Sequence, residues 1–257
     1  MSTHKRSEQF EVGERTSLVV EMRSGTVEVR AGAAGRAAVT LDCDRPDEWE
    51  VVHLGGSLTI QPLARPTWRG NSSRIFVELP EGSDVEVRAV SAEVTCSGVL
   101  GATRVHTRSG DVRLDAVSRL EFNSVSDNLR AHSVSGDATI TTIAGDIDVR
   151  EVGGRLTAST TSGKVRIASV GGDVAISTVS GDVRVERALG SSIGVKCISG
   201  DVNLGLPTGI RVEPDISTLS GRTTLPKPAG SPPEAPKVVR VRLRTVSGNI
   251  TIDRATS

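Results

Sequence analysis

Aromatic side chains, net charge and long apolar runs are all scarce in this sequence of 257 residues. Phenylalanine, tryptophan and tyrosine together make up 2% of the chain, and tyrosine is absent. This leaves no row of rings on which single-stranded nucleic acid stacks, and it requires a core of Val, Ile, Leu and Ala. Basic and acidic residues total 31 each, so no net field holds nucleic acid or an anionic membrane. We therefore expect no nucleic-acid partner.

The N-terminal region and the cysteines bear on the cellular compartment. Residues 1–15 are polar, and the sequence contains no apolar run long enough to cross a bilayer. We therefore expect neither a secretion signal nor a membrane span. Cys43, Cys96 and Cys197 are far apart and odd in number, which is typical of reduced thiols rather than of a disulfide framework. These features predict a cytoplasmic protein.

The middle of the chain repeats every nine residues. The glycines that mark this period are Gly136, Gly145, Gly154, Gly163, Gly172, Gly181 and Gly190, with Gly101 and Gly110 at the same spacing upstream. Gly-Gly turns alternate with Ser-Gly turns, so the full repeat is eighteen residues long. Copies span 132–149, 150–167 and 168–185, and a copy with one extra residue follows at 186–204.

Each nine-residue unit combines a turn with a short alternating strand. In the copy at Gly181, Val183 and Val185 fall on one face and Arg184 on the other, as in a half-buried strand. A strand this short cannot bury its inner face alone, so successive units must stack. We predict an all-β fold, a β-solenoid like a single-stranded β-helix with coils of about 18 residues. The outward columns expected from this stacking are Arg130, Asp148, Arg166 and Arg184, and Thr139, Thr157 and Ala175.

The repeat divides the chain into two predicted regions. Residues 1–80 keep strand alternation without the nine-residue period, and we expect an antiparallel β lead-in that caps the first coil. Residues 81–257 form the solenoid, with a Pro-rich loop at 226–236. A last copy at 245–252 is followed by only five residues, so we expect the C-terminal end of the stack to be the open one.

The Ser-Gly-Asp-Val copies resemble a bacterial family of β-strand-repeat proteins that carry the label putative adhesin, a domain of unknown function. The motifs that carry this resemblance are Ser-Gly-Thr-Val-Glu-Val at 24–29, Leu-Pro at 79–80, and Val-Ser-Gly-Asn-Ile-Thr-Ile at 246–252. The resemblance covers nearly the whole chain. It implies a solenoid-like β fold and transfers no catalytic residue.

Three groups of residues are candidate sites. The turn aspartates suit either turn stabilisation or calcium binding; their phase, with Asp182 directly before Val183, favours the turn. His106 and His132 occupy equivalent repeat positions, but a metal site needs further ligands and the sequence specifies none. Cys197 replaces Thr178 of the preceding copy and is interpreted as a repeat variant. We therefore assign no catalytic, metal-binding or cofactor-binding residue.

The predicted function is a non-catalytic structural or interaction scaffold that binds a protein partner, or itself, through the faces or ends of the solenoid. A carbohydrate-active β-helix enzyme is one alternative, with loop material at 205–244, and a calcium-dependent binding module is the other. For self-association we expect a monomer or a two-fold dimer through the C-terminal end rather than a filament, because a filament needs two open ends.

Overall fold

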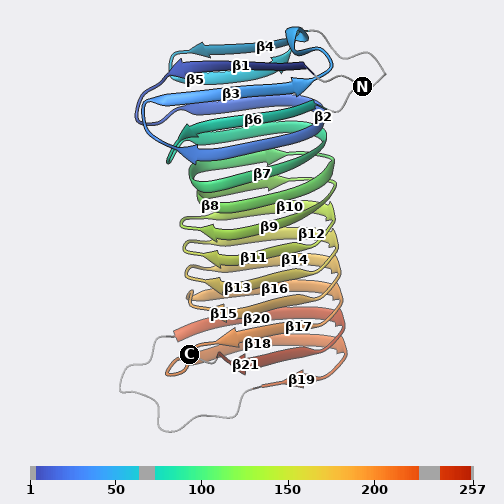
Figure 1. Ribbon diagram of the computed structural model, residues 1–257. Coiled ribbons are helices and arrows are strands. Elements are labelled where there is room, and N and C mark those ends of the chain that lie inside the picture. The colour runs from blue at the N-terminus through green and yellow to red at the C-terminus, as the bar shows by residue number, and fades with distance from the viewer. Residues whose placement is uncertain (1–3, 64–72, 226–237, 256–257) are drawn as a thin grey trace. The chain divides into compact units, whose positions relative to one another are not determined.

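The computed structural model describes residues 4–63, 73–225 and 238–255. These residues are almost entirely β-strand (Figure 1). The chain divides into two compact units, 1–130 and 131–257. The predicted all-β solenoid is confirmed. Residue 80, the boundary expected from the sequence, falls inside the first unit. The Pro-rich segment 226–236 lies outside the described residues.

The first unit is built around one long strand, β2. Its elements are β1 (His4–Glu11), β2 (Ser17–Gly32), β3 (Arg36–Cys43), the 3-10 helix η1 (Pro46–Glu48), β4 (Trp49–Leu54), β5 (Ser57–Pro62), β6 (Ser73–Pro80), β7 (Asp84–His106) and β8 (Ser109–Asn123), while β9 (Ser126–Val134) contains the boundary between the units. β2 pairs in parallel with β5, β6 and β7. Antiparallel pairing joins β3 to β1 and β6, and β4 to β5.

Coil-like stacking therefore begins well before residue 80. Val27 and Val29 of β2 are buried beside Val94 and Cys96 of β7, with which they pair in register. The predicted antiparallel lead-in is thus a mixed arrangement, in which β2 already forms part of a parallel stack. β2 stacks in this way because Val27 and Val29 alternate with polar residues. The two valines therefore line an aliphatic interior of the same kind as that of the later repeats.

The second unit is a stack of two-strand coils. Its strands are β10 (Ala138–Ala144), β11 (Ile147–Val152), β12 (Leu156–Ser162), β13 (Val165–Val170), β14 (Val174–Ser180), β15 (Val183–Ala188), β16 (Ser192–Ser199), β17 (Val202–Leu206), β18 (Arg211–Ser220), β19 (Thr223–Thr224), β20 (Val238–Ser247) and β21 (Ile250–Arg254). Ala138 pairs with Leu156 and Ile147 with Val165, each eighteen residues later. Of the predicted column Arg130, Asp148, Arg166 and Arg184, the last three are in register, and so is the whole column Thr139, Thr157 and Ala175.

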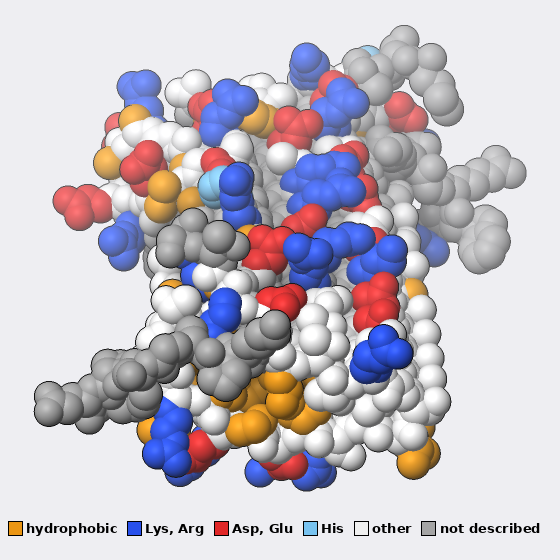
Figure 2. All heavy atoms as spheres, turned by 90° about the horizontal axis from the view of Figure 1, so that it is seen from below, with side chains coloured by type: hydrophobic (Ala, Val, Ile, Leu, Met, Phe, Trp, Pro, Cys, Tyr) orange, Lys and Arg blue, Asp and Glu red, His pale blue; other side chains and the backbone are white. Residues whose placement is uncertain are grey.

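The order of coils in space departs from the order in the chain. β20 lies between β16 and β18, and β21 lies between β17 and β19, all in parallel. The expectation that the copy at 245–252 forms the open end is therefore wrong. The terminal coil is β18 with β19, and Figure 2 looks onto this end.

Hydrophobicity explains this order. The inward residues of β20, Val239, Val241 and Leu243, are at most 1% exposed because a coil covers them on each side. The corresponding positions of β18 include Pro214, which is exposed. A coil at the end of a stack is covered on one side only. Placing the less apolar β18 there exposes less apolar surface to water than placing β20 there would.

Candidate functional site

The turn aspartates bond to the backbone of the neighbouring coil. Oδ1 of Asp137 accepts the amide N–H of Arg155 at 2.9 Å, and Oδ1 of Asp146 accepts that of Lys164 at 2.8 Å. Oδ1 of Asp173 accepts two amides, from Ser191 at 3.1 Å and Ser192 at 3.0 Å. These bonds satisfy amides at the corners, where the strand ladder stops.

The ladder of turn carboxylates continues to the terminal coil. Asp201 accepts the amide of Asn249 at 2.7 Å, and the side-chain oxygen of Asn249 accepts the amide of Arg222 at 3.0 Å. Asn replaces Asp without loss because the bond needs only a side-chain oxygen. Among the described residues, no three His, Cys, Asp or Glu side chains come together as metal ligands. The turn carboxylates are thus used within the fold.

The two histidines lie in different units. His106 is at the end of β7, in register with Asn123, whose side-chain nitrogen lies 3.4 Å from Nδ1 of the ring. His132 lies in the second unit and lines the hollow described below. The residue in register with His106 on β8 is Asn123, and among the described residues neither ring belongs to a group of three potential metal ligands.

The cysteines are interior packing groups. All three are free and buried, and Cys197 pairs in register with Thr178, as the repeat predicts. Burial raises the pKa of Cys43 and Cys197, and it raises the pKa of Cys96 to about 12. A thiol must ionise to attack a substrate, so these three are poor nucleophiles at neutral pH.

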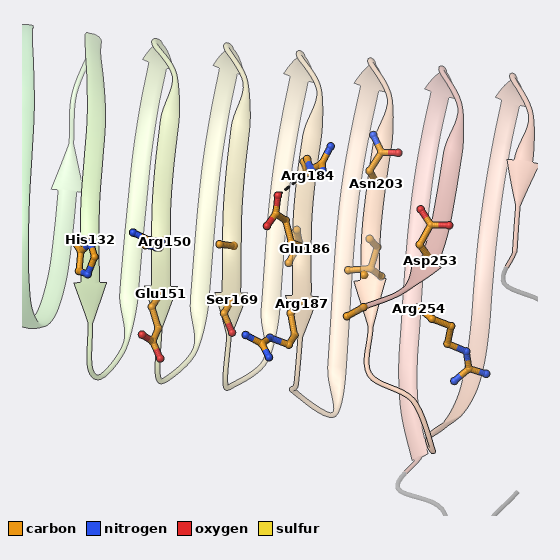
Figure 3. A pocket seen from close by; sticks show the side chains of 15 residues that line it. His132, Arg150, Glu151, Ser169, Arg184, Glu186, Arg187, Asn203, Asp253 and Arg254 are labelled. Atoms are coloured by element: carbon orange, nitrogen blue, oxygen red, sulfur yellow. Dashed lines mark hydrogen bonds and ion pairs between the residues drawn. The ribbon is translucent and has the colours of Figure 1, made fainter. Parts of the chain in front are cut away.

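One outer face of the second unit is charged and hollowed. It is formed by β11, β13, β15, β17 and β21, and the hollow has a volume of about 640 Å³ (Figure 3). In β11 and β15, two consecutive residues are exposed next to a buried one: Arg150 with Glu151, and Glu186 with Arg187. Each of these strands therefore points two consecutive charged side chains outward instead of one.

Small residues create the hollow between these charged coils. Ala168 and Ser169 of β13 stand between the pair on β11 and the pair on β15. Gly205 of β17 separates β15 from the next charged pair, Asp253 and Arg254 on β21. A Cβ atom on Gly205 would overlap the carbonyl oxygen of Glu186, so a larger residue does not fit there. Coils with charged side chains thus alternate with coils that leave room.

Several charges around the hollow have no ionic partner among the described residues. Nε of Arg184 contacts Oε1 of Glu186 at 3.2 Å, but Arg150, Glu151 and Arg187 take part in no ion pair of the described chain. Figure 3 shows Glu151 and Arg187 on either side of Ser169. The hollow therefore presents a free carboxylate and free guanidinium groups across a small polar floor.

The signal for this hollow is present in the sequence, although the nine-residue alignment overlooks it. When the copies are aligned by the observed strand pairing, residues 168–169 fall between residues 150–151 and residues 186–187. Strict alternation within each strand predicts one outward residue where the structure has two in succession. The second outward column of the face was therefore not predicted.

Within the described residues, no helix has the length and apolar character needed to cross a membrane. None of the curated proteins matches this chain. Its fold is similar to that of a putative adhesin from Bacteroides fragilis, with a TM-score of 0.52, 12% identity and 98% of each chain covered. A putative adhesin from Parabacteroides distasonis is also similar, with a TM-score of 0.46, 12% identity, and coverage of 96% of this chain and 97% of the other.

The sequence profile of the Toastrack DUF4097 family matches residues 15–253. This range includes the mixed arrangement around β2, the repeat coils and the inserted β20 and β21. Because the match spans almost the entire chain, the protein belongs to the Toastrack DUF4097 family.

Proposed function

We propose that the protein is a non-catalytic interaction scaffold, and that the hollow on the charged face of its second unit binds an extended segment of a partner protein. The observation that carries this proposal is the set of unpaired charges at Arg150, Glu151 and Arg187 around the small residues Ala168 and Ser169. Unpaired charges of both signs suit a segment that carries charges of both signs.

The magnitude of each contact favours a macromolecular partner over a small ligand. Arg150, Glu151 and Arg187 are exposed, and an exposed ion pair contributes only about 0.2–1 kcal/mol. Micromolar affinity requires about 8 kcal/mol. A small ligand in an open, shallow hollow cannot collect this from a few exposed contacts, whereas a partner lying across several coils can add many.

The adhesin label of the related structures supports a binding role without catalysis. The alternative of a carbohydrate-active enzyme finds less support, because every aromatic residue of the chain precedes Asn123 and none is available in the second unit to stack on a sugar. The alternative of a calcium-dependent module also finds less support. Asp137, Asp146 and Asp173 already accept hydrogen bonds from backbone amides, so a calcium ion would have to compete for these carboxylates.

The test is affinity capture from the native host with the full chain and two variants. The double variant Arg150→Glu with Arg187→Glu should lose the captured protein, because two guanidinium groups at the hollow become carboxylates. Arg166→Glu is the matched control, because Arg166 lies on the same face and does not line the hollow. If both variants captured the partner protein equally, the hollow would not be the binding site.

The enzyme and calcium alternatives are tested on the same material. Release of reducing sugars from polysaccharides, lost in Glu186→Gln, would replace the scaffold with a hydrolase. A rise in Tm on adding calcium, absent from Asp173→Asn, would replace it with a calcium-dependent module.

We also propose that the protein acts in a reducing compartment, which the three free thiols support. Fractionation of the native host with an antibody to the chain tests this. Recovery from the cell surface would contradict it.

A further inference from the structure

The terminal coil of the second unit, β18 with β19, is less buried than the coils beneath it. The inward positions of β18 are Val212, Pro214 and Ile216; Pro214 is exposed, and the other two are only half-buried. β19 pairs with β21 over two residues, whereas β17 pairs with the other side of β21 over five. A segment with few buried contacts opens at a lower free-energy cost than the rest of a fold. The terminal coil therefore comes away from the stack more readily than the coils beneath it.

The strand beneath β18 alternates aliphatic residues with arginines. The buried residues of β20 are Val239, Val241 and Leu243, and the exposed residues between and after them are Arg240, Arg242 and Arg244. Glu213 of β18 contacts Arg240 at 3.7 Å, and Asp215 contacts Arg242 at 2.9 Å and Arg244 at 3.6 Å. Three guanidinium groups thus share two carboxylates, at exposed positions where each ion pair contributes little to stability.

The outer edge of β18 is unsuited to strand addition. In the preceding coils the amide of an inward residue donates to the following coil, as from Val202 to Asn249 and from Ile250 to Arg222. Pro214 is at an inward position, so its backbone faces the open side of the coil, where proline has no N–H to donate. A strand added outside β18 would lack a backbone hydrogen bond near the middle of that strand. The edge of β20, by contrast, contains no proline.

We propose that β20 is an acceptor strand for an extended segment of a partner protein, which takes the place of β18. Strand addition of this kind derives its affinity from backbone hydrogen bonds and its specificity from the alternate side chains of the added segment. The inference concerns a different surface from the hollow and does not depend on the proposed function.

The side chains of β20 define the chemistry of the segment. The buried aliphatic residues of β20 require an aliphatic residue at every second position of the partner, because a polar group there would lose its water without gaining a hydrogen bond. The arginines favour carboxylates at the intervening positions. The segment that fits is therefore an acidic strand, in which Asp or Glu alternates with Val, Ile or Leu, and which runs parallel to β20.

β18 matches this pattern at every position but one. It supplies the two acidic residues, but it places Pro214 in register with Val241, where an aliphatic residue would fit. A partner segment with Val or Ile at that position buries more apolar surface than β18 does. β18 has the advantage of belonging to the same chain, so the partner binds only the fraction of molecules in which β18 is displaced. We therefore expect a short peptide to bind weakly, with a Kd between about 10 µM and 1 mM.

The experiment is a fluorescence-anisotropy titration of a labelled peptide with the full chain. The peptide has the sequence of residues 211–220 with Pro214→Ile, and its anisotropy should rise to saturation. The same peptide with Glu213→Lys and Asp215→Lys should bind at least about tenfold more weakly, because repulsion replaces the ion pairs. The peptide that keeps Pro214 should also bind more weakly, because it buries less apolar surface.

A disulfide between β18 and β20 distinguishes displacement of β18 from binding elsewhere. Ser220 and Ser247 are exposed and in register, so oxidation of Ser220→Cys with Ser247→Cys should join the two strands and abolish peptide binding until the bond is reduced. Ser180→Cys with Ser199→Cys is the matched control, because these residues are also exposed and in register at a corner, on coils deeper in the stack. The control should bind the peptide as the wild type does. Melting curves and thiol titration verify that both variants fold and close their bonds.

Three results would overturn the proposal. They are the absence of binding up to about 1 mM protein, binding that is unchanged by the charge reversal in the peptide, and binding that persists when β18 is joined to β20. The variant Arg150→Glu with Arg187→Glu, at the hollow, should bind the peptide as the wild type does, so the two proposals fail independently.

Discussion

The two units close their coils with different corners. In the second unit the corner column contains Gly145, Gly163, Gly181, Gly200, Gly248 and Gly221, all with positive φ between 137° and 152°. In the first unit Gly25 pairs with Ser73 on one side and Ala92 on the other, and the Ser126 corner has Asp127 where the repeats have glycine. Among the described residues, every positive φ belongs to a glycine.

The comparison shows where glycine is needed. A Cβ on Gly163 would overlap the carbonyl oxygen of Gly145, and one on Gly25 would overlap that of Ser73. Glycine is thus required wherever the left-handed corner brings a carbonyl of the adjacent coil against it. The first unit uses this corner in some coils and another backbone in the rest, which is why its sequence keeps the nine-residue glycine spacing only at Gly101 and Gly110.

The largest expected effect tests the interior of the second unit. Val183→Asp should abolish the unfolding transition of this unit, because it places an unpaired carboxylate in a position that is 0% exposed, at a cost above about 4 kcal/mol. Arg184→Ala, its exposed neighbour, should change the free energy of unfolding by less than about 0.5 kcal/mol. Chemical denaturation followed by circular dichroism measures both. Similar midpoints for the two variants would show that the inward phase is wrong.

The next effect tests the corner itself. Gly163→Ala should lower the free energy of unfolding by about 2–4 kcal/mol, because the methyl group meets backbone that cannot move aside. Gly35→Ala in the first unit also has a positive φ, but no atom lies within 4 Å of its Cβ. It should cost only about 1 kcal/mol. Equal costs would mean that φ alone, and not the adjacent coil, requires glycine.

A smaller effect tests the turn carboxylates. Asp173→Ala removes the acceptor of two amides and should cost about 1–2 kcal/mol. Asp148→Ala is the control, because Asp148 is exposed on a strand rather than at a corner. The difference in Tm between the two variants reports the contribution of the corner bonds. A larger loss of Tm in Asp148→Ala than in Asp173→Ala would contradict the stabilising role of the corner bonds.

The smallest effect concerns Asp127, which is 1% exposed and whose carboxyl oxygens make no hydrogen bond of ordinary geometry within the described residues. Burial raises the pKa of Asp127, the nearby Ser124 hydroxyl opposes part of that rise, and Asp111 adds to it. The carboxyl group of Asp127 therefore binds a proton more tightly in the folded state than in the unfolded state. Its contribution to the free energy of unfolding falls as pH rises above about 3.9.

Asp127→Asn removes that penalty. We expect a gain on the order of 1 kcal/mol at neutral pH that disappears at acidic pH, measured as the difference in unfolding free energy between variant and wild type. Asp148→Asn supplies the control at each pH. A gain that is independent of pH would show that the charge of Asp127 is not its cause.

The sequence predicts the repeat coils because their interior is uniform. Every copy from 132 to 204 keeps an aliphatic pair on each strand, and this fixes the period, the fold and the outward columns. The mixed pairing around β2 could not be predicted in the same way, because Val27 and Val29 fit either an antiparallel or a parallel neighbour. Local alternation determines which side is buried and not which strand lies beside it.

The candidate site was harder to predict for another reason. The hollow depends on two consecutive outward residues at 150–151 and at 186–187, which break the strict alternation of each strand. The order of the last coils was likewise hidden, because each copy fits the stack about equally well by pattern. The choice between β18 and β20 for the covered position rests on the difference between Pro214 and Val241.

The insertion of β20 and β21 between earlier coils has a consequence for synthesis. Strands β10 to β17 can stack in the order in which the ribosome releases them, each coil onto the one before. The segment 211–224 has no such neighbour when it emerges, because its partners are residues 238–251. It must wait until residues 238–251 have also emerged. Completion of this unit is therefore a late, non-local step of folding, and a nascent chain paused before Val238 carries an unfinished end.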